Sequence, residues 1–442
     1  MGHAWFGGPA GGGIASVRAL VAQLFRESEK NLLMRVSAFA RLFTAGVLIF
    51  GFLASAAAAR DQTFDAWLRD FKQEALRSNI SQATLDLALA DVEPIARVIE
   101  LDQKQPEFTQ TFWNYLDKRV TSARIERARK LLATHGDLLG RVQARFGVQP
   151  RFLVSFWALE SNFGDYTGGF PVIGALATLA YDDRRGDFFR AQLLDALRII
   201  DQGHISVQAM QGSWAGAMGQ VQFIPSTFMG HAVDFDGDGR RDLWASLPDI
   251  FASAANYLSA VGWHGDETWG REVRLPQGFD LELADLTLRK PIVEWQALGL
   301  RRIDGGDLPR ADLQAAIVLP AGYKGPAFMV YGNFRSILNW NRSILYAVAV
   351  GHLADRIAGL PPLSTARPES ERPLSRADVE VMQTLLASRG LDPGTPDGVV
   401  GARTRAALKT YQRQVGMAPD GYPSFDVLEA LRQSAGNASR GD

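Results

Sequence analysis

A single glutamate, Glu160, lies on the apolar face of a predicted short helix. Pro150 suits the first turn of this helix and Gly164 suits its end. Helical spacing places the acid in one stripe with core-type residues: Leu153, Phe156, Trp157 and Glu160. Burial and the negative end of the helix dipole both disfavour a charged carboxylate, so we expect a raised pKa, as a general acid near neutral pH requires. A helix-end glutamate that points outward or pairs with an arginine gives the same local pattern.

Residues 212–223 combine small residues, amides and an aromatic ring. Glycines allow a backbone to approach a ligand closely, and Ser and Gln side chains offer neutral hydrogen bonds to hydroxyl and acetamido groups. The ring of Trp214 suits the apolar face of a sugar. Tight helix packing through the small residues is the alternative. No phosphate-loop lysine follows, which argues against a nucleotide site.

The acids near Glu160 include no evident catalytic partner. Glycoside hydrolases usually place a second carboxylate on the other side of the scissile bond. The nearby candidates are Asp165, Asp182 and Asp183, and none lies in an equally apolar stretch. The sequence therefore favours a mechanism in which one acid acts alone.

Residues 234–242 follow the pattern of a calcium-binding loop. Acids stand at its first, third and fifth positions and a glycine at the sixth. The twelfth position holds Ala245, where a bidentate glutamate is usual, and Asp249 further on could substitute. We expect a structural Ca²⁺ and no cofactor for catalysis; a solvated Asp/Gly turn is the alternative. The candidate ligands are Asp234, Asp236, Asp238, Arg240, Asp242 and Asp249.

Composition limits the classes of protein. The chain has 442 residues, 47% hydrophobic and 21% charged, as globular proteins have. Its net charge of -1 argues against a nucleic-acid partner held by bulk electrostatics. Because the chain has no cysteine, it has no disulfide, catalytic thiol, cysteine-based zinc site or bacterial lipoprotein anchor.

The N-terminal region carries an export pattern. Residues 34–59 read as a signal peptide, with a basic start, an apolar core over 42–53 and a small-residue cleavage site before Arg60. The apolar core is shorter than a membrane span requires, so we expect cleavage and no stable membrane anchor afterwards. Residues 1–33 precede this complete signal and are either a mis-assigned translation start or an N-terminal extension. We expect the mature protein in the periplasm of a Gram-negative bacterium.

The remaining chain divides into a large and a small part. Residues 60–360 are mainly helical in pattern, except that short β-type runs between 272 and 334 predict a small inserted sheet. Residues 361–373 are proline-rich and polar, as linkers are. Residues 374–434 predict a compact helical module with a weak repeat of Pro-Asp-Gly turns at 396–398 and 419–421, and residues 435–442 a tail. The module is too small for a catalytic cleft and is predicted to bind a ligand.

Together these motifs identify a resemblance to the B-type lytic murein transglycosylases, periplasmic enzymes that cleave peptidoglycan. The resemblance runs from about residue 64 to residue 357. Its blocks are Glu-Ser-Asn-Phe-Gly (160–164), Ser-Trp-Ala-Gly-Ala-Met-Gly-Gln (213–220), Gln-Phe-Ile-Pro-Ser (222–226), Asp-Leu-Trp (242–244) and Tyr-Gly-Asn-Phe (331–334), with Trp340 and Asn341. The tail is similar to three-helix peptidoglycan-binding modules, through Asp-Gly-Val-Val-Gly (397–401) and Thr404 to Gln412. The fold implied is mainly α: a lysozyme-like catalytic domain with a small inserted β-sheet, then a small three-helix domain.

The resemblance also implies roles for individual residues. Glu160 matches the catalytic acid. Ser213 and Gln222 match polar groups of the sugar subsites, and Met218 matches a residue packed against the acid. The remaining matches are Arg184 and Arg185, which face the glycan substituents, and Asn341 and Tyr346, which form the far wall. Trp340 is a departure, since some members carry tyrosine there.

The implied reaction cleaves the β-1,4 bond between N-acetylmuramic acid and N-acetylglucosamine and leaves 1,6-anhydromuramic ends. Glycan strands of peptidoglycan are the expected partner, nucleic acid is not, and we expect a monomer. A lysozyme-type hydrolase on the same fold, or a non-catalytic wall-binding protein, are the alternatives.

Overall fold

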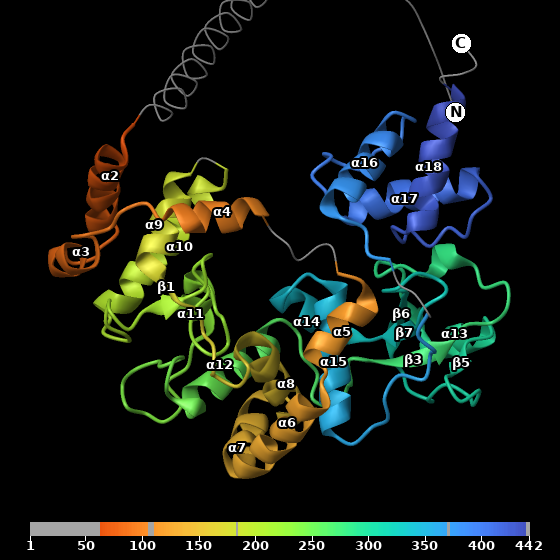
Figure 1. Cartoon of the computed structure of the whole chain (residues 1–442). Helices are drawn as coiled ribbons and strands as arrows, with labels where there is room; N and C mark the ends of the chain where they lie inside the picture. Colours follow the sequence, from red (N-terminus) through yellow and green to blue (C-terminus); the bar gives the residue numbers. More distant parts are fainter. Residues whose placement is uncertain (1–61, 105–109, 183, 369–371, 439–442) are drawn as a thin grey trace, which may run out of the picture. The chain divides into compact units, whose positions relative to one another are not determined.

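The computed structural model describes residues 62–104, 110–182, 184–368 and 372–438 (Figure 1). The predicted extension (1–33) and signal peptide (34–59) lie outside these residues. The chain divides into two compact units, and the boundary, after Phe71, falls inside helix α2 (Phe64–Arg77). No helix in the described ranges is long and apolar enough to span a bilayer.

Helices make up most of the second unit before its large sheet. They are α3 (Gln82–Ala88), α4 (Ala96–Lys104), α5 (Phe112–Arg119), α6 (Ser122–Thr134), α7 (Gly136–Phe146), α8 (Pro150–Ser161), α9 (Val172–Tyr181), α10 (Gly186–Asp201), α11 (Pro225–His231) and α12 (Leu247–Ala260). Threonine side chains accept backbone amides at two of their starts, Thr111 before α5 and Thr121 before α6. The predicted mainly helical character of this region is confirmed.

Helix α8, which carries Glu160, is central to the helical part. Its apolar residues are buried, and it packs against α6, α7 and α15 (Figure 1). Pro150 occupies its first turn, as predicted. The helix ends in three consecutive left-handed residues, Asn162 (φ 52°), Phe163 (φ 63°) and Gly164 (φ 84°). This ending begins two residues before the predicted glycine, and the positive φ of a bulky phenylalanine is a strained feature next to the acid.

The predicted sheet insertion is confirmed between α12 and α14. Its strands are all antiparallel, in the order β4-β6-β7-β3-β5. They are β3 (Gly270–Arg274), β4 (Lys290–Pro291), β5 (Arg301–Arg302), β6 (Gln314–Val318) and β7 (Ala327–Val330), with α13 (Ile292–Ala297) and a 3₁₀ turn (Leu281–Leu283) between them. Trp295 and Met329 are completely buried in a core of the insertion's own. A separate two-stranded ladder pairs β1 (Phe170–Pro171) with β2 (Gln211–Gly212).

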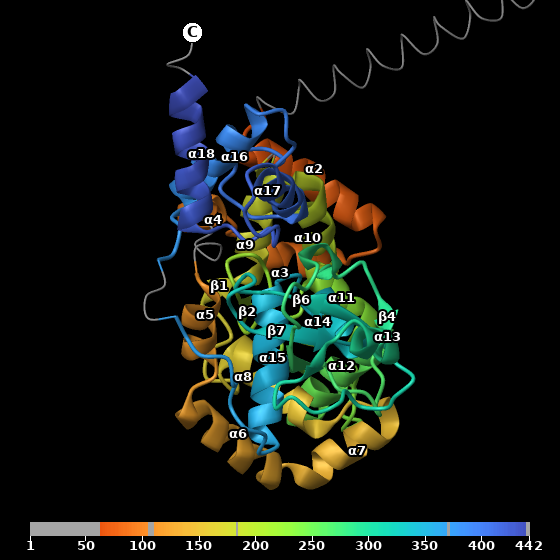
Figure 2. The same ribbon diagram turned by 90° about the vertical axis from the view of Figure 1, so that its right-hand side faces the viewer.

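Trp269 connects the inserted sheet to the last long helix before the linker. Helix α14 (Gly332–Trp340) leads into α15 (Ile344–Ile357), which lies beside the sheet (Figure 2). Trp269 is 1% exposed and lies on Gly351, where an added Cβ would approach its ring to 2.2 Å. Its Nε1 donates a hydrogen bond to Asp355 Oδ2 at 2.8 Å. On the other side, Ser155 of α8 donates to the carbonyl of Val350 at 2.7 Å. These contacts fix α15 between the sheet and α8.

The C-terminal module has three helices, as predicted: α16 (Arg376–Ala387), α17 (Ala402–Gln414) and α18 (Phe425–Ala438). Its sequence repeat is also a structural one. Buried Gln383 accepts the amides of Asp397 and Gly398, and buried Gln412 accepts the amide of Gly421. Each Pro-Asp-Gly turn is therefore held by a glutamine of the preceding helix.

Asp355 makes the stability of the fold depend on pH. Burial raises its pKa to about 6, against the lowering influence of Trp269 and nearby arginines. A raised folded pKa means that stability is greatest at low pH and falls as pH rises through about 6. Between pH 4 and pH 7, this carboxyl group should lower the free energy of unfolding of the wild-type protein by at most about 3 kcal/mol. We expect this decrease to be absent in Asp355→Asn. Denaturant unfolding at several pH values measures the free energy of unfolding, with Glu126→Gln, at an exposed position, as the control. If the free energy of unfolding of Asp355→Asn depended on pH as in the wild-type protein, the assignment would be contradicted.

Candidate active site

Two side chains donate hydrogen bonds to the same oxygen of Glu160. The indole Nε1 of Trp340 donates to Oε1 at 2.9 Å, and the hydroxyl of Tyr346 donates to Oε1 as well. The donors come from the end of α14 and the first turns of α15, 180 and 186 residues further along the chain. Glu160 is thus bonded to two side chains that are remote in the sequence, and it does not point outward as in the alternative interpretation.

Aromatic rings hold Trp340 in place. Its ring centroid lies 4.5 Å from Phe156, 5.4 Å from Phe223 and 5.3 Å from Tyr257, the last at an interplanar angle of 88°. The hydroxyl of Tyr257 donates to the carbonyl of Asn339 at 3.0 Å. The indole is therefore fixed on several sides and its N–H is directed at the acid.

Tyr346 keeps its proton to a higher pH than an ordinary tyrosine. It is 5% exposed, and burial, followed by the neighbouring Glu160, raises its pKa well above the usual value for tyrosine. Tyr115 and Arg119 of α5 also act on it electrostatically, and the Arg119 guanidinium lies 3.7 Å from the centre of the Tyr115 ring. Tyr346 can therefore serve as a lasting hydrogen-bond donor to the carboxylate.

The block 212–223 is anchored to the Glu160 helix by Gln220, a residue not predicted as important. Its Oε1 accepts from Trp157 Nε1 at 2.7 Å, and its Nε2 donates to the carbonyl of Trp244 at 2.7 Å. Gly164 leaves room for this side chain, since an added Cβ would approach Gln220 Oε1 to 2.4 Å. This amide ties three separate segments together.

The glycines of the block serve packing within the protein. A Cβ at Gly216 would lie 2.4 Å from Leu176, and one at Gly219 would lie 2.5 Å from the carbonyl of Leu243. The predicted reason for these glycines was close approach to a ligand, and the alternative was tight helix packing. Gly216 and Gly219 pack closely against other segments of the protein, in a block of turns and short strand pairings that is not a helix.

The predicted polar contacts of the block differ in their availability. Gln222 donates from Nε2 to the carbonyls of Thr167 and Gly219, both at 2.9 Å, which orients its amide. Ser213 accepts the amide of Ala217 at 3.0 Å and is partly exposed. Met218 is completely buried, and its backbone bridges to Phe223. Gln222 and Ser213 are partly exposed and can meet a ligand, whereas Met218 is enclosed by the protein.

The two predicted substrate arginines share one buried carboxylate. Arg185 donates to Asp102 Oδ1 at 2.6 Å, and Arg184 pairs with Asp102 Oδ2 and its carbonyl. Asp102 is 3% exposed, while both arginine side chains are about half exposed. Because two arginines share one aspartate, this part of the surface keeps a net positive charge. The aspartate also fixes the direction of both guanidinium groups. Asn341, also predicted, is exposed and accepts the amide of Ser343 at 3.0 Å.

Asp165 forms an ion pair with Arg127 at the protein surface. Arg127 donates to its Oδ1 at 2.9 Å and Asn162 to its Oδ2 at 2.9 Å, and the hydrogen bond from Arg127 lowers the pKa of Asp165. Asp182 accepts the amide of Arg184, and Asp183 lies outside the described residues. Asp165 and Asp182 therefore have local structural roles.

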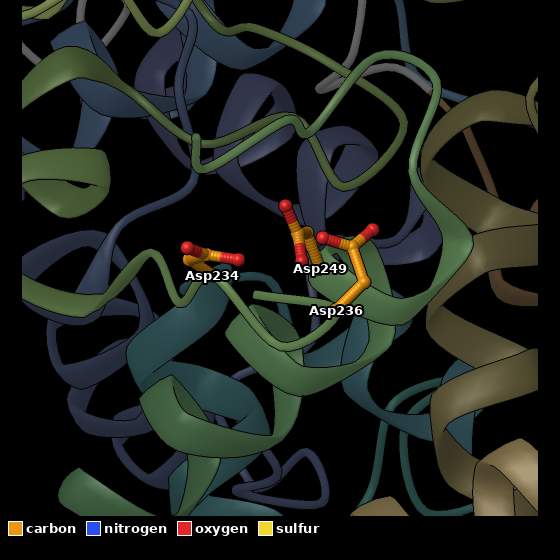
Figure 3. Close-up of side chains that lie close together, drawn as sticks. All are labelled: Asp234, Asp236 and Asp249. Carbon is orange, nitrogen blue, oxygen red and sulfur yellow. The ribbon is translucent and has the colours of Figure 1, made fainter. Parts of the chain in front are cut away.

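Three of the predicted metal ligands converge. Carboxylate oxygens of Asp234, Asp236 and Asp249 lie within 4.8 Å of one another, the first two from the loop and the third from α12 (Figure 3). Asp249 is completely buried, and burial raises its pKa. It accepts the amides of Phe235 and Asp242, which shapes the loop around it. An all-oxygen set with a buried anion fits a hard cation such as Ca²⁺.

The other predicted ligands lie outside this group. Asp242 accepts the amides of Trp244 and Ala245, so it closes a turn. Asp238 accepts the amide of Arg240 at 2.8 Å and pairs with its side chain. The substitution of Asp249 for the missing twelfth ligand is the part of the prediction that the geometry favours.

Most residues missed by sequence analysis act across long sequence separations. Asp102 and Gln220 carry no motif that reveals their partners. The sequence analysis assigned no contact to Trp340, and in the structure its indole donates a hydrogen bond to Glu160. Asp102 lies in α4, a helix of mixed polar and apolar residues, so its local sequence does not mark it as buried.

Comparison with known proteins agrees with this geometry. The Transglycosylase SLT domain family matches residues 63–355, and a peptidoglycan binding domain family matches residues 375–431. The crystal structure of SltB3 from Pseudomonas aeruginosa in complex with NAG-anhNAM-pentapeptide has a TM-score of 0.81 and 48% identity, covering 84% of this chain and 100% of that one. Membrane-bound lytic murein transglycosylase B of Escherichia coli (strain K12) is 31% identical over 65% of this chain and 79% of its own length.

A further relative has a structure that contains calcium. The Escherichia coli lytic transglycosylase Slt35, in a structure in complex with calcium, is 26% identical with a TM-score of 0.58, covering 66% of this chain and 92% of that one. With its SLT domain, its lysozyme-like fold and its peptidoglycan-binding domain, the chain belongs to the B-type lytic murein transglycosylases, enzymes that cleave peptidoglycan.

Proposed function

We propose that Glu160 is the single catalytic acid and base of this lytic transglycosylase. The observation that carries the proposal is the convergence of Trp340 and Tyr346 on one carboxylate oxygen at the end of α8. Hydrogen bonds of this kind orient a carboxyl group and stabilise the anion that remains after proton transfer.

The reaction then needs one protein carboxyl. Protonated Glu160 gives its proton to the glycosidic oxygen between N-acetylmuramic acid and N-acetylglucosamine, and that bond breaks. The N-2 acetamido group of the substrate shares the positive charge at the anomeric carbon, so no protein nucleophile is required. The carboxylate takes the proton of the C6 hydroxyl, whose oxygen attacks the anomeric carbon and closes a 1,6-anhydro ring.

The surrounding polar groups suit the sugar and its substituents. Gln222 presents an amide oriented by two backbone carbonyls, and Ser213 and Asn341 offer further neutral contacts. We assign Arg184 and Arg185, pre-positioned by Asp102, to the anionic groups of the stem peptide.

We further propose that the mature chain is exported to the periplasm through residues 34–59 and acts there as a monomer without a membrane anchor. The C-terminal module keeps the enzyme on peptidoglycan, and no nucleic-acid partner is expected. Asp234, Asp236 and Asp249 hold a structural Ca²⁺, with the remaining loop positions as further candidate ligands. Catalysis through Glu160 needs no cofactor.

The central test is Glu160→Gln. The variant keeps the size and the acceptor oxygen of the side chain but cannot give or take the proton, so we expect folding and murein binding to survive and activity to fall about 10²- to 10⁴-fold. Release of soluble muropeptides from murein measures it, with Asp165→Asn as a control that retains activity. Mass spectrometry of the wild-type products should show 1,6-anhydromuramic ends; reducing ends would indicate a hydrolase, and full activity in Glu160→Gln would refute its assignment.

Asp102→Asn tests the arginine pair. Loss of the shared anion frees both guanidinium groups, so we expect the KM for peptide-bearing glycan to rise several-fold with little change in kcat. Asp195→Asn, which loses an ion pair with Arg198 on α10, is the matched control. An unchanged KM in Asp102→Asn would show that the pair does not contact substrate.

Calcium should stabilise the folded chain by binding its native state alone. At 100 times the dissociation constant the gain is about 2.7 kcal/mol, which raises the Tm by a few degrees. We expect Asp249→Asn to abolish this rise and the exposed Asp137→Asn to preserve it. A Tm that neither calcium nor a chelator moves in the wild-type protein would argue against the ion.

A further inference from the structure

We propose that Trp340 is a positioning residue that decides which oxygen of Glu160 carries the transferred proton: Oε1 is held as an acceptor, and Oε2 gives and later takes the proton. The proposal rests on the proposed role of Glu160 as catalytic acid.

The argument begins with the donors. An indole N–H can only donate, whereas a phenol can donate or accept. Trp340 and Tyr346 both donate to Oε1, which matches the two lone pairs of a carbonyl oxygen. A proton on Oε1 would point at the indole N–H and leave a hydrogen bond unmade. The neutral carboxyl group therefore keeps its proton on Oε2.

The indole cannot easily turn aside to relieve this restriction. Phe156, Phe223 and Tyr257 contact the Trp340 ring with centroid separations between 4.5 and 5.4 Å. The ring is also at the last position of α14, where the neighbouring Asn339 carbonyl accepts the Tyr257 hydroxyl. The donor direction is thus set by packing before substrate arrives.

The arrangement suits one group that acts twice. In the first step the Oε2–H bond breaks and an O–H bond forms on the leaving sugar; the negative charge left on the carboxylate is stabilised by both donors on Oε1. In the second step Oε2 accepts the proton of the C6 hydroxyl. The same oxygen performs both transfers, and the side chain need not rotate between them.

Trp340→Phe tests the proposal because it removes the N–H and keeps an aromatic ring. Loss of a hydrogen bond to a charged group should lower kcat about 10- to 100-fold, with KM little changed. Because the lost donor favours the ionised acid, the alkaline limb of the pH–rate profile should move up by about one unit. Trp295→Phe, which loses the buried indole bond to the Ala315 carbonyl inside the sheet insertion, should leave both kcat and the limb unchanged.

A measurement on the folded wild-type chain covers the case in which Trp340→Phe does not fold. In a ¹⁵N-labelled sample the indole N–H signal of Trp340 should shift with pH, and this shift should vanish in Glu160→Gln. The signal of Trp269, which donates to Asp355, should keep its own pH dependence in that variant. A Trp340→Phe variant with a wild-type alkaline limb, or no indole signal that depends on Glu160, would overturn the proposal. An active Glu160→Gln would instead refute the catalytic assignment on which it rests.

Discussion

The site depends on one requirement: two donors from the C-terminal part of the catalytic region must reach Oε1 of a glutamate at the end of α8. A hydrogen bond tolerates only a few tenths of an ångström in length, so α8, α14 and α15 must keep a fixed relative placement. Ser155, which donates to the Val350 carbonyl, connects α8 to α15 about one and a half helical turns before Glu160. The strained turn after Ser161 completes the arrangement by returning the chain toward Gln220.

The inserted sheet has a mechanical role in this arrangement. It contributes neither Glu160 nor its two donors, but Trp269 presses on Gly351 and donates to Asp355, and both of these belong to the helix that carries Tyr346. A side chain at Gly351 would collide with this indole, so the glycine permits the close approach of sheet and helix. Keeping Asp355 buried costs solvation, which its raised pKa expresses.

Sequence analysis succeeded where the signal was local. The stripe around Glu160, the short β-type runs and the Pro-Asp-Gly turns each depend on residues a few positions apart, and the corresponding elements are present. It failed where the partner is remote. Nothing near Arg184 and Arg185 indicates that Asp102, 82 and 83 residues earlier, holds both. Local composition also misled for the glycines of 212–223, because a missing side chain looks the same whether a ligand or Leu176 fills the space.

Trp340 restricts where the proton of Glu160 can lie, and it does so without removing the acid's function. A hydroxyl in place of the indole could donate to the acid or accept from it, so the proton could lie on either oxygen of the carboxyl group. An indole removes one of these two places. The cost is adaptability, since the carboxyl group can no longer present either oxygen as its acid. The gain is that a single carboxylate, which must act as acid and then as base on neighbouring atoms of one sugar, begins each turnover with its proton on the oxygen that transfers it.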